Sequence, residues 1–390
     1  MTATRLDANR RELLGREAPL DRLELLELAV PQLRPFKSAI GERHERRALI
    51  VRWLATDGSW GVGECSCRPD PFFSGEFVDG AIAVIRDFIR PLLGGPRLTL
   101  GTLVLALGRI RGWPFTAASL LEAALDRERR LGRADALELL APPGEPLERV
   151  PVGISLGLYD APEGALRAVE DAAAQGYRRV KMKVSPAMNV ETVREVRRAF
   201  PDLHLALDAN GSCGPGDEAF LDSLADLDPE ALEQPFAPED LDRCADLRAR
   251  IPGLRITLDE SLTGFGALRS AERLGALDEV NLKPGRVGGQ LETCAILRYC
   301  SKIGRAAWVG GMFETGIGRH ANLRVAARLP AAAAHDLSPS SRYFSRDVVA
   351  HPLEMAADGT IDMSDDSPVE LDEAALADMT VRRFELRGLR

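Results

Sequence analysis

The stretch RVKMKV, residues 179–184, places two lysines, Lys181 and Lys183, in a run with the composition of a buried strand. Alternate residues of a strand point to the same face, so both side chains share one side of the expected strand. Two ammonium groups on a buried face are costly unless anionic groups lie opposite them. A solvated lysine face on an edge strand is the ordinary alternative. The rest of the chain decides between these two interpretations.

Short apolar runs that end in polar residues alternate with helix-like segments from residue 150 onward. The runs are VPVGIS, RVKMKV, LHLALDAN, ALEQP, LRITLDES, EVNLKPG, AAWVGG and AAAAHDLS. The segments between them, such as 190–200, 220–228 and 290–302, carry apolar residues at helical spacing. Strict alternation of strands and helices indicates a parallel sheet, and eight such units predict a (β/α) barrel, which is an α/β fold.

One ionisable residue lies near the end of each of five consecutive runs. These residues are Lys183, Asp208, Glu233, Asp259 and Lys283. Successive members lie about 25 residues apart, roughly the length of one strand–helix unit. A helix cap would explain any single one of them, but a cap does not require this register. Because barrel enzymes do their chemistry where the strands end, at one mouth, we expect these five side chains to converge on one site.

Three of the five residues are carboxylates that would come from adjacent strands: Asp208, Glu233 and Asp259. Crowding would raise their pKa values unless a cation neutralises them. Oxygen ligands without histidine or cysteine favour a hard ion, with Mg²⁺ ahead of Mn²⁺ or Ca²⁺. Such an ion beside a substrate carboxylate would stabilise the enediolate that forms when the α-proton is lost.

The lysines complete this predicted site. Lys183 and Lys283 flank the carboxylates from opposite sides, the arrangement needed to take a proton from one face of a carbon and deliver one to the other. Lys181, on the same face as Lys183, would lower the pKa of Lys183 by like-charge repulsion and could contact the substrate carboxylate. Both lysines of the RVKMKV stretch are therefore expected to face an anionic, metal-centred site.

Size and composition narrow the classes of protein. The chain has 390 residues, which predicts two domains, and its net charge of −9 argues against a nucleic-acid partner. No apolar run approaches the length of a membrane span, and the first residues lack the apolar core of a signal peptide. Six scattered cysteines without a Cys-x-x-Cys pair fit reduced thiols. We therefore expect a soluble, cytoplasmic protein that binds neither nucleic acid nor membrane.

Eight segments resemble the o-succinylbenzoate synthase and N-acylamino acid racemase family, in the muconate-lactonizing subgroup of the enolase superfamily. They are VGISLGL, VKMKVSP, LALDANGS, LEQPFAPEDL, TLDES, VNLKPGRVGG, VGGMFETGIGRHAN and DLSPSSRYF. Further upstream, LRPFKSAIG and FFSGEFVDGA resemble the two mobile loops that the capping domain of this family lays over the barrel mouth. The resemblance extends from Leu23 to Val381.

This resemblance implies a modified (β/α)7β barrel of the TIM type with an α+β capping domain. The implied organisation has an N-terminal extension (1–21), the first part of the capping domain (22–130), the barrel with the active site (131–340), and a C-terminal segment that returns to the capping domain (341–390). The resemblance also implies a small-molecule carboxylate as substrate and a homo-oligomer. It assigns no role to the extension.

The resemblance also implies roles for individual residues. Asp208, Glu233 and Asp259 are the Mg²⁺ ligands, Lys183 and Lys283 are the acid/base pair, and Lys181 assists Lys183. The positions that line the substrate pocket are Ser155, Asn210, Gly311, Met312 and Phe313. Phe313 is bulkier than the aliphatic residue common at its position, which bears on the shape of the substrate. Arg286, three residues after Lys283, is a candidate for tuning that lysine, and a solvated loop arginine or a contact at a helix start is the alternative.

Two reactions are compatible with this set. The first is the dehydration of 2-succinyl-6-hydroxy-2,4-cyclohexadiene-1-carboxylate to o-succinylbenzoate, a step of menaquinone synthesis, in which Lys183 would act as base and then as acid. The second is racemisation of N-acylamino acids such as N-succinylamino acids, which needs one lysine on each face. Both begin with removal of a proton next to a metal-bound carboxylate, so the set does not separate them. We rank the synthase first and allow both activities in one protein.

Other functions fit the sequence less well. A dipeptide epimerase would be expected to carry an Asp-x-Asp motif where this chain has GGMFETG. A non-catalytic binding module on the same fold would have no need for the complete set of lysines and carboxylates.

Overall fold

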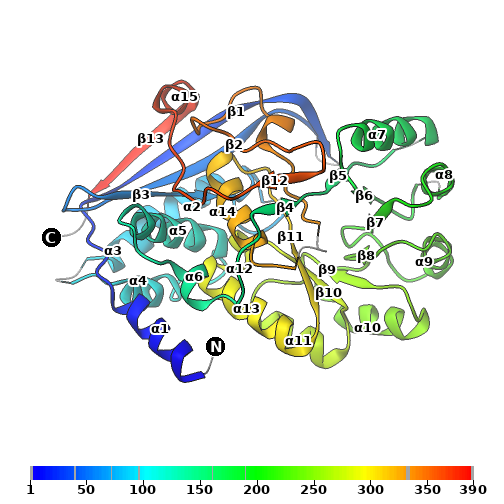
Figure 1. Cartoon of the computed structure of the whole chain (residues 1–390), viewed down its shortest axis with the longest axis horizontal. Helices are drawn as coiled ribbons and strands as arrows, with labels where there is room; N and C mark the ends of the chain where they lie inside the picture. The colour runs from blue at the N-terminus through cyan, green and yellow to red at the C-terminus, as the bar shows by residue number, and fades with distance from the viewer. Residues whose placement is uncertain are drawn as a thin grey trace.

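The computed structural model describes residues 3–38, 41–71, 73–94, 97–159, 161–188, 190–330 and 334–387. Within them lie an antiparallel sheet of four strands, a parallel sheet of seven strands and a two-stranded ribbon. Figure 1 shows the antiparallel sheet along one side of the molecule and the parallel strands, with their helices, on the other. The two sheets correspond to the two parts that the sequence predicts.

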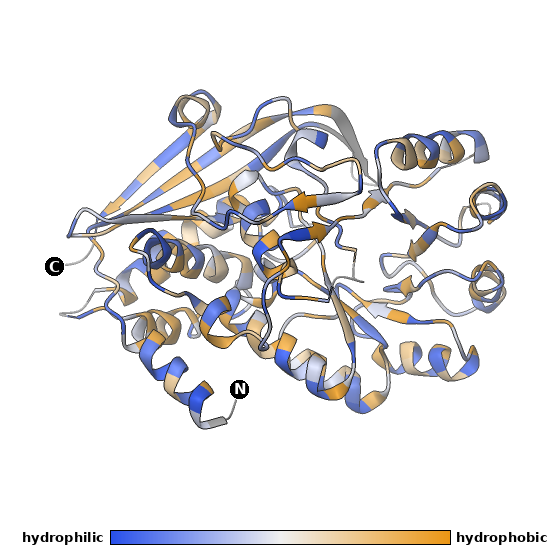
Figure 2. Cartoon of the chain, viewed as in Figure 1, coloured by the Kyte–Doolittle hydropathy of each residue, from blue (hydrophilic) through white to orange (hydrophobic). Residues whose placement is uncertain are grey.

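The antiparallel sheet has the strand order β13-β1-β2-β3. Its strands are β1 (Arg22–Ser38), β2 (Gly41–Leu54), β3 (Trp60–Cys65) and β13 (Thr380–Arg387). Polar and apolar residues alternate along these strands (Figure 2). Because successive side chains point to opposite faces, Leu23 and Leu25 pack into the main core, while Leu26 and Leu28 pack into a second cluster with Leu376. Both faces of the sheet are therefore covered.

Helix α5 (Pro114–Arg130) crosses β3 at very short range. A Cβ atom on Gly61 would lie 2.1 Å from the carbonyl oxygen of Ala123, and one on Gly63 would lie 2.2 Å from that of Ser119. Only glycine fits at these two positions without displacing the helix. The other helices of this region are α2 (Val78–Val84), the π-helix Ile85–Ile89, α3 (Arg90–Leu92), α4 (Leu100–Leu107) and α6 (Ala136–Leu140).

The predicted N-terminal extension contains a helix, α1 (Ala3–Gly15). Leu13 is buried in the main core, Asn9 Nδ2 donates to the carbonyl oxygen of Leu139 at 2.9 Å, and Arg16 Nη1 donates to that of Ala134 at 2.5 Å. The extension therefore packs against the helices next to the barrel.

The parallel sheet contains β5 (Ile154–Leu156), β6 (Arg179–Lys183), β7 (His204–Asp208), β8 (Leu232–Glu233), β9 (Ile256–Leu258), β10 (Glu279–Leu282) and β11 (Ala306–Val309), hydrogen-bonded in chain order. Its helices are α7 (Pro162–Ala174), α8 (Glu191–Ala199), α9 (Glu218–Ala225), α10 (Leu241–Arg250), α11 (Phe265–Leu274), α12 (Pro284–Val287), α13 (Gln290–Ile303) and α14 (Gly316–Ala326). The predicted alternation of strands and helices is confirmed.

The described part of the eighth predicted run, residues 334–338, closes the barrel between β11 and β5, and residues 331–333 of that run lie outside the described residues. Asp336 N donates to the carbonyl oxygen of Val309 at 3.0 Å, and Gly153 N donates to that of His335 at 2.7 Å. His335 and Asp336 thus take the place of a strand, and the sheet is curled into the expected α/β barrel of the TIM type.

The remaining chain connects the two parts. The ribbon pairs β4 (Arg149–Pro151) with β12 (Thr360–Asp362), and a 3₁₀ turn (Ser340–Arg342) and α15 (Glu373–Met379) complete the segment before β13. Strand β13 pairs with β1, so the segment after residue 379 lies in the same sheet as the first strand. The exact division into four parts stays a prediction. Within the described part of the chain, no helix combines the length and the apolar composition that a membrane crossing requires.

Candidate active site

The five ionisable residues predicted to converge lie at the carboxyl ends of five consecutive strands. Lys183, Asp208 and Glu233 are the last residues of β6, β7 and β8, and Asp259 and Lys283 directly follow β9 and β10. The register places Lys183 beside Asp208 and Asp208 beside Glu233. The structure therefore brings all five to the same mouth of the barrel.

The three carboxylates form a buried row. Asp208, Glu233 and Asp259 are each 2% exposed, so solvent does little to separate their charges. Burial raises the pKa of Glu233 to about 8, and the charges of Asp208 and Asp259 add to the rise against the opposing effect of Lys181. Burial therefore favours the protonated form of Glu233 between its two acidic neighbours.

Lys181 lies beneath this row with two carboxylate partners at equal distance. Its Nζ atom is 2.8 Å from Glu233 Oε2, 2.8 Å from Asp336 Oδ2 and 3.5 Å from Asp208 Oδ2. It also lies 5.0 Å from the centre of the Trp308 ring. Although burial opposes it, Asp336 and Glu233 raise the pKa of Lys181, which is therefore held as a buried cation. Anionic groups opposite the buried lysine are what the RVKMKV stretch led us to expect.

The sequence analysis missed Asp336 as a member of the site. Asp336 follows the eighth apolar run at the place that the five predicted residues occupy in theirs, and that shared place was the available signal. Asn281 was also missed: its Nδ2 donates to Glu233 Oε1 at 2.9 Å. A fully buried asparagine inside a strand needs a hydrogen-bond partner, but the sequence does not say which one.

Lys183 lies at the more open side of the mouth. Its side chain is 34% exposed, and its Nζ atom is 3.2 Å from Asp208 Oδ2 and donates to Asn210 Oδ1. Asn210 has a left-handed backbone with φ 43°, and its Nδ2 donates to Glu260 Oε1 at 3.0 Å. The loop after β7 therefore holds Asn210 beside Lys183, as expected for a residue of the pocket.

Lys283 lies at the closed side. Its side chain is 10% exposed, and its Nζ atom is 2.7 Å from Asp259 Oδ2. Arg286 is buried rather than solvated: its Nη1 donates to Asp259 Oδ1, its Nε to the carbonyl oxygen of Leu262 at 3.0 Å and its Nη2 to that of Asn281 at 2.9 Å. Although burial opposes it, Arg286 and Lys283 hold the pKa of Asp259 below its usual range. Arg286 therefore acts on the same carboxylate as Lys283.

The segment after β11 contributes three of the predicted pocket residues. Gly311 N donates to the carbonyl oxygen of Asp336 at 3.1 Å, and Met312 N donates to Glu314 Oε1 at 2.8 Å. Phe313 has a left-handed backbone with φ 59°. The three residues form a tight loop between β11 and α14.

Three further contacts place this loop and Ser155, the last predicted pocket residue. The Phe313 ring packs edge-on against Tyr343 with centroids 5.0 Å apart, and Arg46 Nε, from β2, donates to the carbonyl oxygen of Phe313 at 3.3 Å. Ser155 stands opposite Lys181 in the β5–β6 pair. The capping sheet thus contacts the mouth loop directly.

The predicted covering loops are described only in part. Phe73 has its ring centre 5.6 Å from Lys283 Nζ, so the second loop reaches the closed side of the mouth. Residue 72 of that loop, and residues 39–40 and the side chains of 34–43 in the first loop, lie outside the described residues. Closure of the two loops over a substrate stays a prediction.

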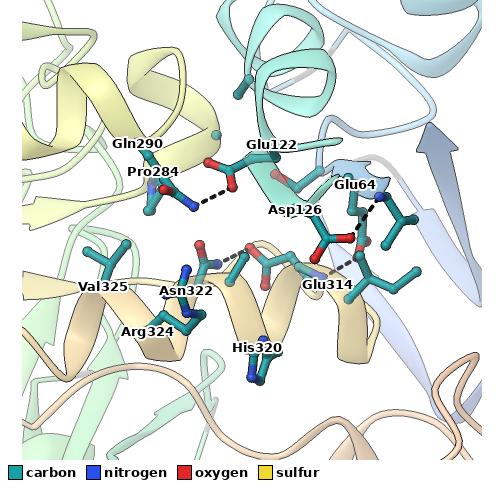
Figure 3. Close-up of a pocket in the computed structure, with 18 of the residues that line it drawn as sticks. Glu64, Glu122, Asp126, Pro284, Gln290, Glu314, His320, Asn322, Arg324 and Val325 are labelled. Atoms are coloured by element: carbon teal, nitrogen blue, oxygen red, sulfur yellow. Dashed lines mark hydrogen bonds between the residues drawn. The ribbon is translucent and has the colours of Figure 1, made fainter. Parts of the chain in front are cut away.

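A small polar cavity of about 50 Å³ lies beneath the mouth loop, between β3, α5 and α14. Figure 3 shows Glu64, Glu122 and Glu314 around it. Glu64, from the capping sheet, accepts hydrogen bonds from Thr315 Oγ1 at 2.7 Å and Gly318 N at 3.1 Å, at the start of α14. Burial, with the charge of Glu314 adding, raises the pKa of Glu64 to about 7. This carboxylate joins the capping sheet to the barrel.

The chemistry of the carboxylate row fits a hard divalent ion, although its present geometry does not enclose one. Among the described residues, no three histidine, cysteine or acidic side chains are grouped closely enough to hold a metal ion. The lysines are paired with the row instead, Lys181 with Glu233, Lys183 with Asp208 and Lys283 with Asp259. Burial first, and then the charges of Asp208 and Asp259, raise the pKa of Glu233, and a cation bound at the row would oppose both effects.

Comparison with known proteins identifies the family. The sequence pattern described as "Enolase C-terminal domain-like" matches residues 164–374, which is more than half of the chain. The chain belongs to the enolase superfamily.

Relatives within the enolase superfamily cover most of the chain. An N-succinylamino acid racemase from Amycolatopsis is 37% identical over 335 residues, covering 84% of this chain and 89% of its own. An o-succinylbenzoate synthase from Listeria innocua is 32% identical over 332 residues, covering 85% and 88%. A solved structure described as a member of the enolase superfamily, also from Listeria innocua, has a TM-score of 0.87 at 30% identity and covers 95% and 99%. The predicted family and fold are confirmed.

Proposed function

We propose that the protein is an o-succinylbenzoate synthase that also racemises N-succinylamino acids. The observation that carries this proposal is the placement of two lysines at opposite ends of one carboxylate row, with Lys183 paired to Asp208 and Lys283 paired to Asp259. Two bases that face one carbon from opposite sides suit removal of an α-proton and its return. Relatives under both names, at 32% and 37% identity, support the pair of activities.

Asp208, Glu233 and Asp259 would hold the metal, which we propose to be Mg²⁺, with Mn²⁺ as a substitute. When bound, the ion supplies positive charge to a substrate carboxylate as it becomes an enediolate. Lys181 keeps the row in place from below because it contacts Glu233 and Asp336 at the same time. Asn281 holds the second oxygen of Glu233, so this carboxylate has a fixed orientation.

Dehydration would use mainly Lys183. Its amine takes the proton α to the substrate carboxylate, and the resulting ammonium returns a proton to the departing hydroxide, so that water leaves and o-succinylbenzoate remains. Lys283 stays protonated beside the enediolate and stabilises its negative charge. The greater exposure of Lys183 suits the lysine that must exchange protons with a leaving group.

Racemisation would use both lysines, one on each face. One amine removes the α-proton of the N-succinylamino acid, and the opposite ammonium delivers a proton to the other face. The specific observation that favours this second activity is the contact between Arg286 and Asp259. Arg286 anchors Asp259, and Asp259 in turn positions Lys283. A lysine that transfers protons needs such a fixed position.

The test uses both substrates with the purified protein and Mg²⁺. We expect o-succinylbenzoate to form, followed by its ultraviolet absorbance, and optical rotation of N-succinyl-L-amino acids to decay. Chelation of the metal should stop both reactions, and added Mg²⁺ should restore them. Failure of the protein to exchange the α-proton of either substrate would contradict the proposal.

The finer assignments belong to the same proposal. We propose that the protein acts in menaquinone synthesis, in the cytoplasm, on a small carboxylate substrate, and that it forms a homo-oligomer. We also propose the division into an N-terminal extension (1–21), the first part of the capping domain (22–130), the barrel (131–340) and a C-terminal segment that returns to the capping domain (341–390). Light scattering after size exclusion measures the oligomeric state.

A further inference from the structure

A side pocket of about 740 Å³ opens between the capping region and the loops that follow β8, β9 and β10. Its apolar wall includes Val104, Leu107, Ile110, Trp113, Val287 and Leu291. The volume falls in the range of small-molecule sites, which combine a mostly apolar wall with a few polar groups. It is distinct from the small cavity beneath the mouth loop.

Three of the lining residues connect this side pocket to the reacting centre. The Phe73 ring lies 5.6 Å from Lys283 Nζ, and Arg286 contacts Asp259. Glu260 Oε1 accepts a hydrogen bond from Asn210 Nδ2 at 3.0 Å, and Asn210 contacts Lys183. These contacts put the side pocket next to the site, although the two lysines and the three carboxylates of the row do not line it.

The charged residues that line the side pocket are four carboxylates and one guanidinium. Arg286, the guanidinium, has its Nε, Nη1 and Nη2 engaged by Leu262, Asp259 and Asn281. Both oxygens of Glu76 are likewise engaged, because Oε1 accepts from Phe115 N and Oε2 from Thr116 N at the start of α5. The charges that remain to act on a ligand are carboxylates.

Those carboxylates are Glu239, Glu260 and Glu292. Glu239 is exposed, and Glu292 Oε1 accepts from Phe265 N at 2.8 Å. Glu260 Oε2 is buried and, among the described residues, has no hydrogen-bond partner. A partly enclosed pocket in which carboxylates outnumber positive charges attracts a cation and repels an anion.

We propose that the side pocket binds the side chain of an N-acylamino acid substrate and favours a long aliphatic side chain with a positively charged end. The apolar wall would pack against the methylene groups, and the carboxylates would lie near the charged end. The same charges repel acidic side chains and the succinyl carboxylate, which directs the acyl group away from this pocket. This inference rests on the proposed racemase activity and names its substrate class.

The test compares three substrates that differ in charge at the end of the side chain: N-succinyl-L-lysine, N-succinyl-L-norleucine and N-succinyl-L-glutamate. Exchange of the α-proton in deuterated water, followed by proton NMR, gives kcat/KM for each. We expect lysine to exceed norleucine by about tenfold, and norleucine to exceed glutamate by about tenfold or more. Equal values for all three, or a preference for glutamate, would overturn the side-pocket proposal alone. Absence of exchange with every substrate would overturn the proposed function as well.

A double variant, Glu239→Gln with Glu292→Gln, tests the pocket itself. Glutamine removes the charge and keeps an acceptor for Phe265 N, and circular dichroism checks the fold. We expect the ratio of kcat/KM for the lysine and norleucine substrates to fall severalfold toward one. Glu145→Gln is the matched control, because Glu145 is exposed in the segment before β4 and should leave the ratio as in the wild type. An unchanged ratio in the double variant would show that these carboxylates do not select the side chain.

Discussion

The two lysines at the ends of the carboxylate row have the same chemistry but different surroundings. Among the residues that the structure describes, Lys183 contacts Asp208 and Asn210, both of the barrel, and its side chain is 34% exposed. Lys283 is 10% exposed, shares Asp259 with Arg286 and has Phe73 of the capping region near it. Within the described residues, the Lys183 side of the mouth is therefore lined by the barrel and the Lys283 side by barrel and cap together, while the side chains of 34–43 in the first covering loop lie outside them. Substitutions in the described part of the cap, such as at Phe73, should affect the Lys283 side most, and racemisation, which needs both lysines, should slow as a result.

The largest expected effect on turnover comes from a substitution of Glu233, which lies between the two lysine sides. Glu233→Gln removes the ionisable group at the centre of the row and leaves one acceptor oxygen where Lys181 and Asn281 now contact one oxygen each, while it keeps the volume. We expect Mg²⁺-dependent turnover to fall by about a thousandfold or more, with both lysine sides affected alike. Circular dichroism should show an intact fold. Retained turnover at ordinary Mg²⁺ would contradict the metal assignment.

Separate removal of each lysine distinguishes the two faces. Lys183→Ala and Lys283→Ala should each lose racemisation by about a hundredfold or more, because the second proton transfer has no donor. In deuterated water each variant should still exchange the α-proton of one enantiomer, since the remaining lysine reaches only its own face. Dehydration should collapse in Lys183→Ala and fall in Lys283→Ala. The measurement is proton NMR with separate L and D substrates, and equal exchange of both enantiomers by either variant would rule out the two-face arrangement.

A substitution of Arg286 should weaken the closed side selectively. Arg286→Met removes the donor to Asp259 and leaves the volume similar, so Lys283 loses part of its positioning. We expect exchange by the Lys283 face to fall by about tenfold to a hundredfold, and exchange by the Lys183 face to fall less. Arg286→Lys should restore part of the loss. Equal losses on both faces would mean that Arg286 acts on the whole row rather than on Lys283.

The smallest expected effect is on the stability of the fold, through Glu64, and it should change neither lysine side of the mouth. The pKa of Glu64 in the folded protein, about 7, exceeds that of a free glutamate. Its contribution to the free energy of unfolding is therefore fully present below pH about 4.3 and is lost as the pH rises through about 7. In Glu64→Gln this titration is absent. The free energy of unfolding of the variant relative to wild type should therefore rise by roughly 2 kcal/mol from pH 5 to pH 8. Urea melts at both pH values, with Glu145→Gln as control, measure it, and a pH-independent difference would refute the shift.

The sequence predicts the barrel and its row of charges well because both depend on repetition. Lys183, Asp208, Glu233, Asp259 and Lys283 recur at the spacing of one strand–helix unit, and the fold converts that spacing into proximity. The same repetition extends to the eighth run, where Asp336 occupies the equivalent place but was not predicted as a site residue.

Contacts between distant segments could not be predicted in the same way. Glu64 reaches Thr315 across 251 residues, and Glu76 reaches Phe115 across 39 residues. The first depends on how the cap is docked onto the barrel, the second on how a loop and helix α5 meet within the cap, and no periodic pattern encodes either. Asn281 shows a related limit: its burial demands a partner, but only the folded barrel determines that the partner is Glu233.

The pairing of β1 with β13 has a consequence for the order in which the protein assembles during synthesis. Arg22 stands opposite Arg387, so one edge of β1 cannot be paired until the ribosome has added residues 380–387. Strands β5 to β11, by contrast, pair with neighbours that are close in the chain and are complete much earlier. The barrel can therefore form on the nascent chain before the antiparallel sheet is finished, and β1 must wait with an open edge that a chaperone or a second chain can bind.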